Sequence, residues 1–119
     1  MTHSDAMHSI TTFMKAEVLK GHLDMLLLTT IRERPAHGYA IAERLRVRSD
    51  GAFGLAEGTL YPALRRLESA GFVRSRWSEV SGRRRRVYQL TQKGQSRLAT
   101  QKRDWREFAR AVFAVVDAS

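Results

Sequence analysis

Apolar residues recur at the spacing of an α-helix in four stretches of the chain. The first stretch begins at Leu19 and ends at Pro35, because proline disfavours helical geometry in the residue that precedes it. The second stretch is shorter. It follows a predicted turn at residues 37–39 and ends near Arg48. The third and fourth stretches lie near residues 58–71 and 91–115.

The third helix is expected to begin near Gly58 or Thr59 and to present two different faces. Pro62 sets this start, since proline is tolerated only in the first turn of a helix. Gly71 suits the end of the helix. One stripe is expected to pack against the core: Leu60, Leu64, Leu67 and Gly71. Residues off that stripe are expected to contact a partner: Tyr61, Arg65, Arg66 and Ser69.

Two strands are predicted after the third helix. Residues 72–77 alternate apolar and polar side chains, residues 78–82 supply turn residues, and residues 87–90 form the second strand. A basic quartet is expected near the tip of this hairpin: Arg83, Arg84, Arg85 and Arg86. Helices followed by a hairpin with a basic tip are typical of a winged helix-turn-helix. The predicted fold class is therefore α+β, mainly α, with a C-terminal dimerisation helix.

The fourth helix carries an apolar seam that is too long for one small domain. Thr91 is a suitable N-cap for it. The seam repeats every seven residues along Leu98, Gln101, Trp105, Phe108, Val112 and Val115. Because about 25 helical residues span nearly 40 Å, a second copy of the chain is expected to cover the seam. The expected dimer contacts are Leu98, Trp105, Phe108, Val112 and Val115.

These elements divide the chain into three predicted parts. Residues 1–18 form an N-terminal extension, residues 19–90 a winged helix-turn-helix DNA-binding domain, and residues 91–119 the dimerisation helix. Trp105 and Phe108 have two interpretations: they pack the dimer, or they line a cavity between subunits for a small aromatic or lipophilic effector.

The charge of the chain favours a polyanionic partner. Twenty-one Lys and Arg against twelve Asp and Glu leave a formal net charge of +9, concentrated between residues 71 and 110. Double-stranded DNA is the expected partner. On the third helix the candidate contacts are Thr59, Tyr61, Pro62, Arg65 and Arg66, of which Thr59, Tyr61 and Arg65 are the better candidates for base-edge contacts. The basic quartet suits the minor groove.

Other kinds of protein are disfavoured by what the sequence lacks. With no cysteine, thiol catalysis and thiolate metal sites are excluded. No metal-ligand cluster, phosphate-binding glycine loop or catalytic constellation is indicated, so we expect no enzyme, metal or cofactor. No apolar run approaches the roughly 18 residues that span a bilayer, and no signal peptide is visible. The expected location is the cytoplasm, with the nucleoid when DNA is bound. The alternative function is a winged-helix protein interaction module with a basic docking face.

The motifs of the chain closely resemble those of the PadR family of bacterial transcriptional regulators. The resemblance covers about residues 19 to 117, and its most specific parts are the segments 58–64 and 82–91. It implies a homodimer that binds an inverted-repeat operator, usually as a repressor, and that is released by a small effector such as a phenolic acid or a lipophilic drug. The single C-terminal helix is similar to that of the family's smaller subgroup.

The resemblance also implies roles for residues at matching positions. Thr59, Tyr61 and Arg65 match the recognition helix, the four arginines match the wing, and Trp105 matches an aromatic residue that borders a ligand cavity in some relatives. Ala56 departs from the pattern, since many members have a serine there that caps the recognition helix.

Overall fold

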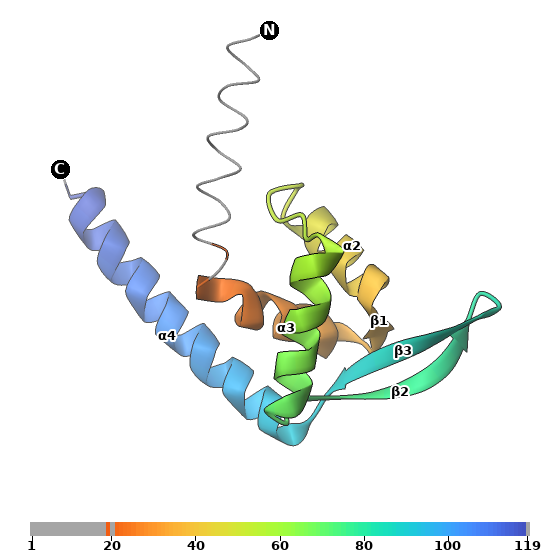
Figure 1. The fold of residues 1–119 in the computed structure, drawn as a ribbon. Coiled ribbons are helices and arrows are strands. Elements are labelled where there is room, and N and C mark those ends of the chain that lie inside the picture. Colours follow the sequence, from red (N-terminus) through yellow and green to blue (C-terminus); the bar gives the residue numbers. More distant parts are fainter. Residues whose placement is uncertain (1–18, 20, 119) are drawn as a thin grey trace, which may run out of the picture.

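The computed structural model describes residue 19 and residues 21–118 (Figure 1). The predicted N-terminal extension, residues 1–18, lies outside this part. A first helix over residues 21–33 precedes the labelled elements. These follow in the order β1 (Ala36–His37), α2 (Gly38–Arg48), α3 (Glu57–Ser69), β2 (Val73–Val80), β3 (Arg83–Leu90) and α4 (Gln92–Val116). Within the described residues, no helix is long and apolar enough to cross a bilayer.

The helices pack together beside a small antiparallel sheet of order β1-β3-β2, which confirms the predicted winged-helix architecture, mainly α with a small β component. The core contains side chains from each described helix and from the sheet. Among the most buried are Leu27, Ile31, Ile41, Leu64, Leu67, Val73 and Leu98. The β2–β3 hairpin and α4 project from this core on opposite sides (Figure 1). The predicted packing stripe of α3 is confirmed, because Leu60, Leu64 and Leu67 are buried.

The helix and turn boundaries differ from the prediction in two places. Helix α3 begins at Glu57, and Pro62 therefore lies beyond the first turn, inside the helix. The N–H groups of Thr59 and Leu60 both donate to the carbonyl of Ala56, at 3.0 and 2.9 Å, so the helix is already formed before Pro62. The turn predicted at residues 37–39 does not form: His37 belongs to β1, whose Ala36 pairs with Tyr88 on β3, and residues 38–39 begin α2.

The wing hairpin is longer and tighter than predicted. Residues 78–80 belong to β2, and the turn contains only Ser81 and Gly82, with φ of 53° and 77°. Positive φ at both positions is typical of the two-residue hairpin turn whose twist matches that of the strands. The basic quartet therefore lies in β3 rather than at the tip, and its side chains alternate between the two faces of the hairpin.

Two glycines fix the junction between α3, β2 and α4. Gly71 has φ of 82° and ends α3 as predicted, with Phe72 N–H donating to the Leu67 carbonyl at 2.9 Å. Thr91 caps α4 as predicted: its Oγ1 accepts from Gly94 N–H at 3.0 Å. A Cβ atom at Gly94 would overlap the carbonyl group of Phe72. The start of α4 therefore lies directly on the backbone that connects α3 to the wing.

Candidate nucleic-acid interface

The outward face of α3 carries all five residues predicted to contact DNA. Thr59, Tyr61, Pro62, Arg65 and Arg66 are exposed, while the opposite face of the helix is buried. The N-cap residue Ala56 makes no side-chain hydrogen bond, which agrees with the absence of a serine at this position. The start of α3 is thus capped by backbone hydrogen bonds alone in the described structure.

Tyr61 is held against the first residue of α2. A Cβ atom added at Gly38 would lie 2.6 Å from Tyr61 Cε1 and 2.9 Å from its hydroxyl oxygen, so the ring fills the space above Gly38. The tyrosine nevertheless remains 39% exposed. The sequence pattern predicts Gly38 only as part of a turn. A glycine at the start of a helix, where a side chain would normally be tolerated, is the one sequence feature that could have indicated this close approach of the Tyr61 ring.

Tyr88 of β3 connects the candidate face of α3 to the wing. Its side chain is buried, and burial is the main cause that raises the pKa of its hydroxyl. Glu68 raises this pKa further, while Arg86 and Arg65 act in the opposite direction, so charges of both α3 and β3 act on the hydroxyl. Glu68 also accepts a hydrogen bond from Ser75 Oγ of β2 at 2.6 Å. This hydrogen bond joins α3 to the face of the hairpin that carries Ser75 and Tyr88.

Arg65 and Arg66 have different environments although they are neighbours. Arg66 forms an ion pair with Asp24 of the first helix and is half-exposed. This contact bridges α3 to the first helix, whereas Arg65 takes part in none of the ion pairs among the described residues. The two guanidinium groups are therefore not equivalent candidates for contacts with DNA.

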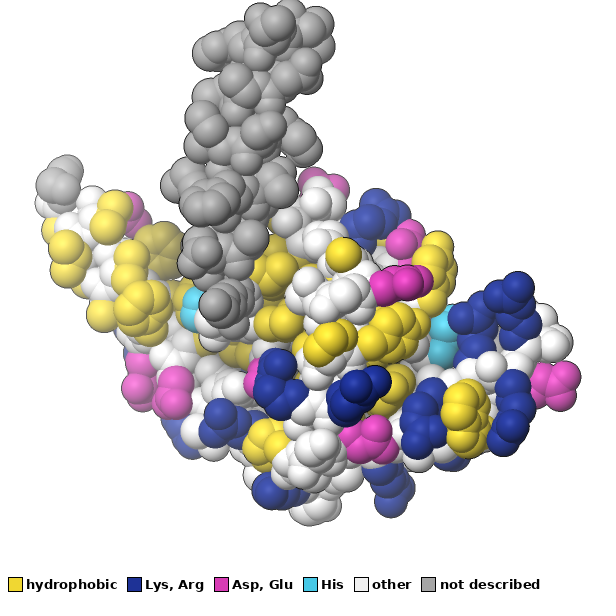
Figure 2. Space-filling view, viewed as in Figure 1, with side chains coloured by type: hydrophobic (Ala, Val, Ile, Leu, Met, Phe, Trp, Pro, Cys, Tyr) yellow, Lys and Arg dark blue, Asp and Glu magenta, His cyan; other side chains and the backbone are white. Residues whose placement is uncertain are grey.

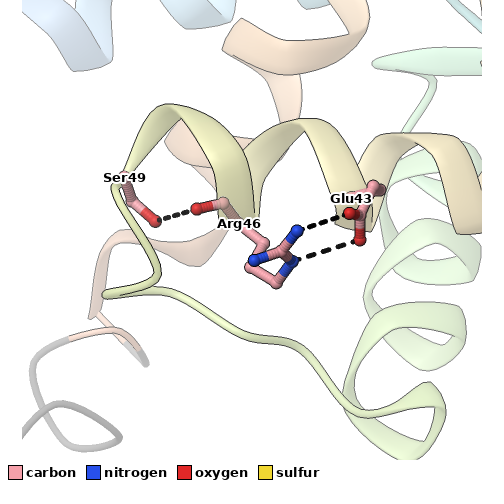
Figure 3. A network of polar contacts seen from close by, with 3 residues as sticks. All are labelled: Glu43, Arg46 and Ser49. Carbon is pink, nitrogen blue, oxygen red and sulfur yellow. Dashed lines mark hydrogen bonds and ion pairs between the residues drawn. The ribbon is translucent and has the colours of Figure 1, made fainter.

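On α2, basic side chains are paired with acidic ones. Arg46 donates to both carboxylate oxygens of Glu43, at 2.6 and 3.2 Å, and Figure 3 shows its side chain turned back along the helix. Ser49 Oγ donates to the carbonyl of Arg46 at 3.2 Å. Arg48 pairs with Glu33 of the first helix. Much of the positive charge of α2 is thus balanced locally.

The wing keeps its positive charge unpaired within the described part of the chain. None of the ion pairs there involves an arginine of β2 or β3. Figure 2 shows Lys and Arg side chains gathered over the hairpin. Its basic residues are Arg74, Arg76, Arg83, Arg84, Arg85 and Arg86. Of the residues opposite them in the register, only Glu79 is acidic. This surface has the electrostatic character expected for binding a polyanion.

His37 lies on β1 beside this basic surface. Burial is the main cause that lowers the pKa of its imidazole, and the charges of Arg85 and Arg44 lower the pKa further. The neutral form is therefore favoured in the folded chain. No group of three or more potential metal ligands occurs among the described residues.

The predicted dimer residues of α4 fall into two groups that differ in burial. Leu98 is only 1% exposed and packs in the core of its own chain, so it is not available to a partner subunit. Beyond it the apolar side chains are exposed, and Figure 2 shows hydrophobic residues along the outer half of α4. These residues are Trp105, Phe108, Val112 and Val115 from the predicted seam, and also Phe113 and Val116, which the seven-residue repeat did not include.

A groove of about 220 Å³ lies between the first helix and α4. Trp105 packs edge-on against His22, with 5.0 Å between ring centroids, and lies 6.2 Å from Phe108. Gln101 also lines the groove, and its Oε1 atom is buried without a hydrogen-bond partner among the described residues. The groove therefore combines aromatic surface with a polar side chain whose buried oxygen is unsatisfied.

A three-helix core with a basic β-hairpin wing defines the class of winged helix-turn-helix transcriptional regulators. Within that class, the chain belongs to the PadR-like family, whose model matches residues 27–100. This membership confirms the family resemblance. It also places the chain among transcriptional regulators rather than enzymes.

Individual relatives agree with the family assignment. A transcriptional regulator of Mycobacterium tuberculosis is 38% identical over 80 residues, covering 67% of this chain and 72% of that protein. The crystal structure of a PadR family regulator from Eggerthella lenta superimposes with a TM-score of 0.79 at 32% identity, covering 96% of this chain and 98% of the other. A PadR family regulator from Clostridium difficile gives a TM-score of 0.66 at 37% identity, covering 78% and 95%. PadR regulators bind DNA and typically dimerise.

Proposed function

We propose that two copies of this chain bind an inverted-repeat operator in double-stranded DNA and repress transcription. The observation that supports this most directly is the hydrogen bond from Ser75 of β2 to Glu68 of α3, which joins the basic hairpin to the helix that exposes Tyr61 and Arg65. Helix α3 enters the major groove and the wing contacts the adjacent minor groove. Tyr61, Arg65 and Thr59 contact base edges, and Pro62 and Arg66 complete the interface on α3. In the cell the regulator is cytoplasmic and associates with the nucleoid when it binds DNA.

The four arginines of β3 supply the second part of this proposed interface. Arg83, Arg84, Arg85 and Arg86 are unpaired within the described residues and lie on a hairpin that projects beyond the core. Arginine is favoured in narrow, strongly negative minor grooves. Their charge contributes to affinity for any duplex, whereas α3 distinguishes between sequences.

The proposed dimer forms through the outer half of α4. Trp105, Phe108, Val112 and Val115 remain exposed in the single chain, and a large apolar surface of this kind is typical of an interaction site. Pairing of two α4 helices places two α3 helices about one turn of DNA apart, roughly 34 Å, or a multiple of it. Residues 19–90 then bind DNA and residues 91–119 join the subunits.

We further propose that a small aromatic or lipophilic effector binds beside Trp105 and Phe108 and releases the DNA. The groove at these residues supports this, because it is lined by aromatic side chains and by Gln101, whose buried Oε1 has no hydrogen-bond partner among the described residues. Titrating a phenolic acid and a lipophilic dye separately into Trp77→Phe protein follows Trp105 fluorescence alone. Saturable quenching that Gln101→Leu weakens is expected. Equal quenching of Gln101→Leu protein would contradict the role of Gln101.

The DNA-binding proposal is tested by selecting duplexes from a random pool and measuring affinity by fluorescence anisotropy. Arg65→Ala and Tyr61→Ala are each expected to weaken binding to the selected duplex by about 1–3 kcal/mol, or five- to more than a hundredfold. Binding to a random duplex should change much less. Arg110→Ala on α4 is the matched control, since it removes the same charge far from α3 and should leave discrimination intact.

The same titration separates this proposal from a protein interaction module. Wild-type protein should continue to prefer the selected duplex in heparin at physiological salt. Selection that yields no preferred duplex, with heparin displacing all DNA, would leave the basic surface as a docking face for acidic proteins. Equal losses on selected and random duplexes for Arg65→Ala would instead contradict its base-edge role.

A further inference from the structure

The two faces of the wing carry different sets of side chains. Trp77 pairs with Arg86 across the hairpin, and Arg84 lies two residues from Arg86, so all three side chains share one face. Ser75, also on this face, donates its hydrogen bond to Glu68 of α3. The face is therefore the one turned toward α3. Arg83 and Arg85 lie on the opposite face.

Trp77 is an exposed aromatic residue between two positive charges. Its side chain is 54% exposed. The guanidinium carbon of Arg84 lies 4.9 Å from the ring centroid, and that of Arg86 lies 5.0 Å from it. Both distances fall within the roughly 6 Å range of cation–π attraction, and tryptophan is the strongest partner for it. The ring therefore holds two guanidinium groups that would otherwise move independently.

Contact with the Trp77 ring restricts the two arginine side chains before any ligand binds. Arginine side chains lose considerable rotamer freedom when they are fixed on a ligand, and a platform that restricts them beforehand lowers this loss. Arg83 and Arg85 make no cation–π contact within the described residues. The hairpin thus contains one restrained pair of arginines and one unrestrained pair of equal charge.

We propose that Trp77 is a positioning residue that presents Arg84 and Arg86 as one unit to the DNA phosphates beside the base pairs contacted by α3. This rests on the proposed function, because it assigns a role within the same DNA-binding surface. Trp77 acts through the two arginines rather than through contact with bases. The opposite pair, Arg83 and Arg85, contributes mainly through long-range attraction.

The first experiment compares two double variants with identical net charge. Binding of Arg84→Ala/Arg86→Ala and of Arg83→Ala/Arg85→Ala to the selected duplex is measured across a series of salt concentrations. The first variant should bind at least about tenfold more weakly than the second at physiological salt. Its slope of log affinity against log salt should flatten by roughly 0.9 for each DNA phosphate that the variant no longer neutralises. Equal losses of affinity and slope in the two variants would overturn the proposal.

The second experiment tests the ring itself. Trp77→Ala should weaken binding by about five- to thirtyfold, because each of the two arginines would then lose roughly 0.5–1 kcal/mol more rotamer freedom on binding, and should flatten the salt slope. Trp77→Phe keeps an aromatic face and should retain most of the affinity and slope. Thermal unfolding should be nearly unchanged in both, because the side chain is half-exposed. If Trp77→Ala binds like wild type, or if phenylalanine fails to rescue it, the positioning role is wrong.

A control variant distinguishes this role from direct contact with DNA. In protein that already carries Arg84→Ala and Arg86→Ala, adding Trp77→Ala should cost no further affinity. A further loss as large as that in wild type would mean that the ring contacts DNA by itself and would overturn the proposal. Failure of wild-type protein to discriminate among duplexes would instead refute the proposed function, so the two failures are separable.

Discussion

Helices α3 and α4 both place apolar side chains along one face, but those faces have different surroundings. In α3 the whole apolar face is covered by the chain's own core: Leu60, Ala63, Leu64 and Leu67 are at most 2% exposed. In α4 this is true only near the start, where Gly94 and Leu98 are buried. Farther along, Phe108 is 60% exposed and Phe113 is 62% exposed.

This difference shows that an amphipathic pattern alone does not reveal what covers it. The apolar stripe of α3 fixes the helix so that its outward residues are oriented by contacts within one chain. The outer half of α4 has no comparable cover among the described residues and, in the proposed dimer, gains it from a second copy. Substitutions in α3 or its neighbours should therefore alter recognition within a subunit, whereas substitutions in outer α4 should alter association.

The largest expected effect is on association. Phe108→Gln should weaken the proposed dimer by roughly 3–6 kcal/mol, since burying a phenylalanine contributes about 1.5–3 kcal/mol and each residue occurs twice in a symmetric interface. The dissociation constant should then rise by about two to four orders of magnitude. Sedimentation velocity over a concentration series measures this, and far-UV circular dichroism checks that the fold is retained.

Arg110→Gln is the control for this prediction. It introduces the same residue into the same part of α4 but at a position outside the seven-residue repeat. Its dissociation constant should stay close to that of wild type. Indistinguishable sedimentation of Phe108→Gln and wild-type protein as dimers would mean that the outer half of α4 is not the interface.

A smaller effect is expected at the opposite end of α4, where the helix contacts its own chain. Gly94→Ala should destabilise the fold by about 1–3 kcal/mol, the usual cost of forcing an extra carbon into a packed site, because the new Cβ overlaps backbone of Phe72. Urea unfolding measures the loss. At Gly58 nothing lies within 4 Å of an added Cβ. Gly58→Ala should leave stability unchanged or raise it by up to about 1 kcal/mol. Equal responses at the two glycines would contradict the close approach at Gly94.

Features determined by nearby residues could be predicted from the sequence. The buried stripe of α3 follows from helical periodicity, the end of α3 from Gly71, and the start of α4 from Thr91. Each depends on a few neighbouring residues and on local backbone geometry. The hairpin was also predicted. The predicted turn, residues 78–82, is longer than the actual turn, because residues 78–80 can occupy either a loop or an exposed strand.

Contacts between distant segments could not be predicted in the same way. Strand β1 exists only because Ala36 and His37 pair with β3, far along the chain. The ion pair of Arg66 with Asp24 and the packing of Tyr61 over Gly38 likewise join separate elements. Periodicity describes each element alone, so it identified which residues of α3 face outward but not what holds them.

The smallest expected effect tests that last point at Gly38. Alanine has the better helix propensity, so at an open site Gly38→Ala would stabilise α2. Here the added Cβ lies 2.6 Å from Tyr61 Cε1, and the ring must move. We expect operator affinity to fall by about 1 kcal/mol, roughly fivefold, with much less change for random DNA.

A double-mutant cycle with Tyr61→Ala identifies the cause of this loss. Anisotropy titrations of the selected duplex are compared for wild type, both single variants and the double variant. Without the ring, Gly38→Ala has nothing to displace and should cost no further affinity, so the two changes should be strongly non-additive. Independent losses would show that Gly38 acts on α2 rather than through Tyr61. The outward face of α3 would then not depend on this contact with α2. The contrast between α3, which is oriented by contacts within its own chain, and outer α4 would be weaker.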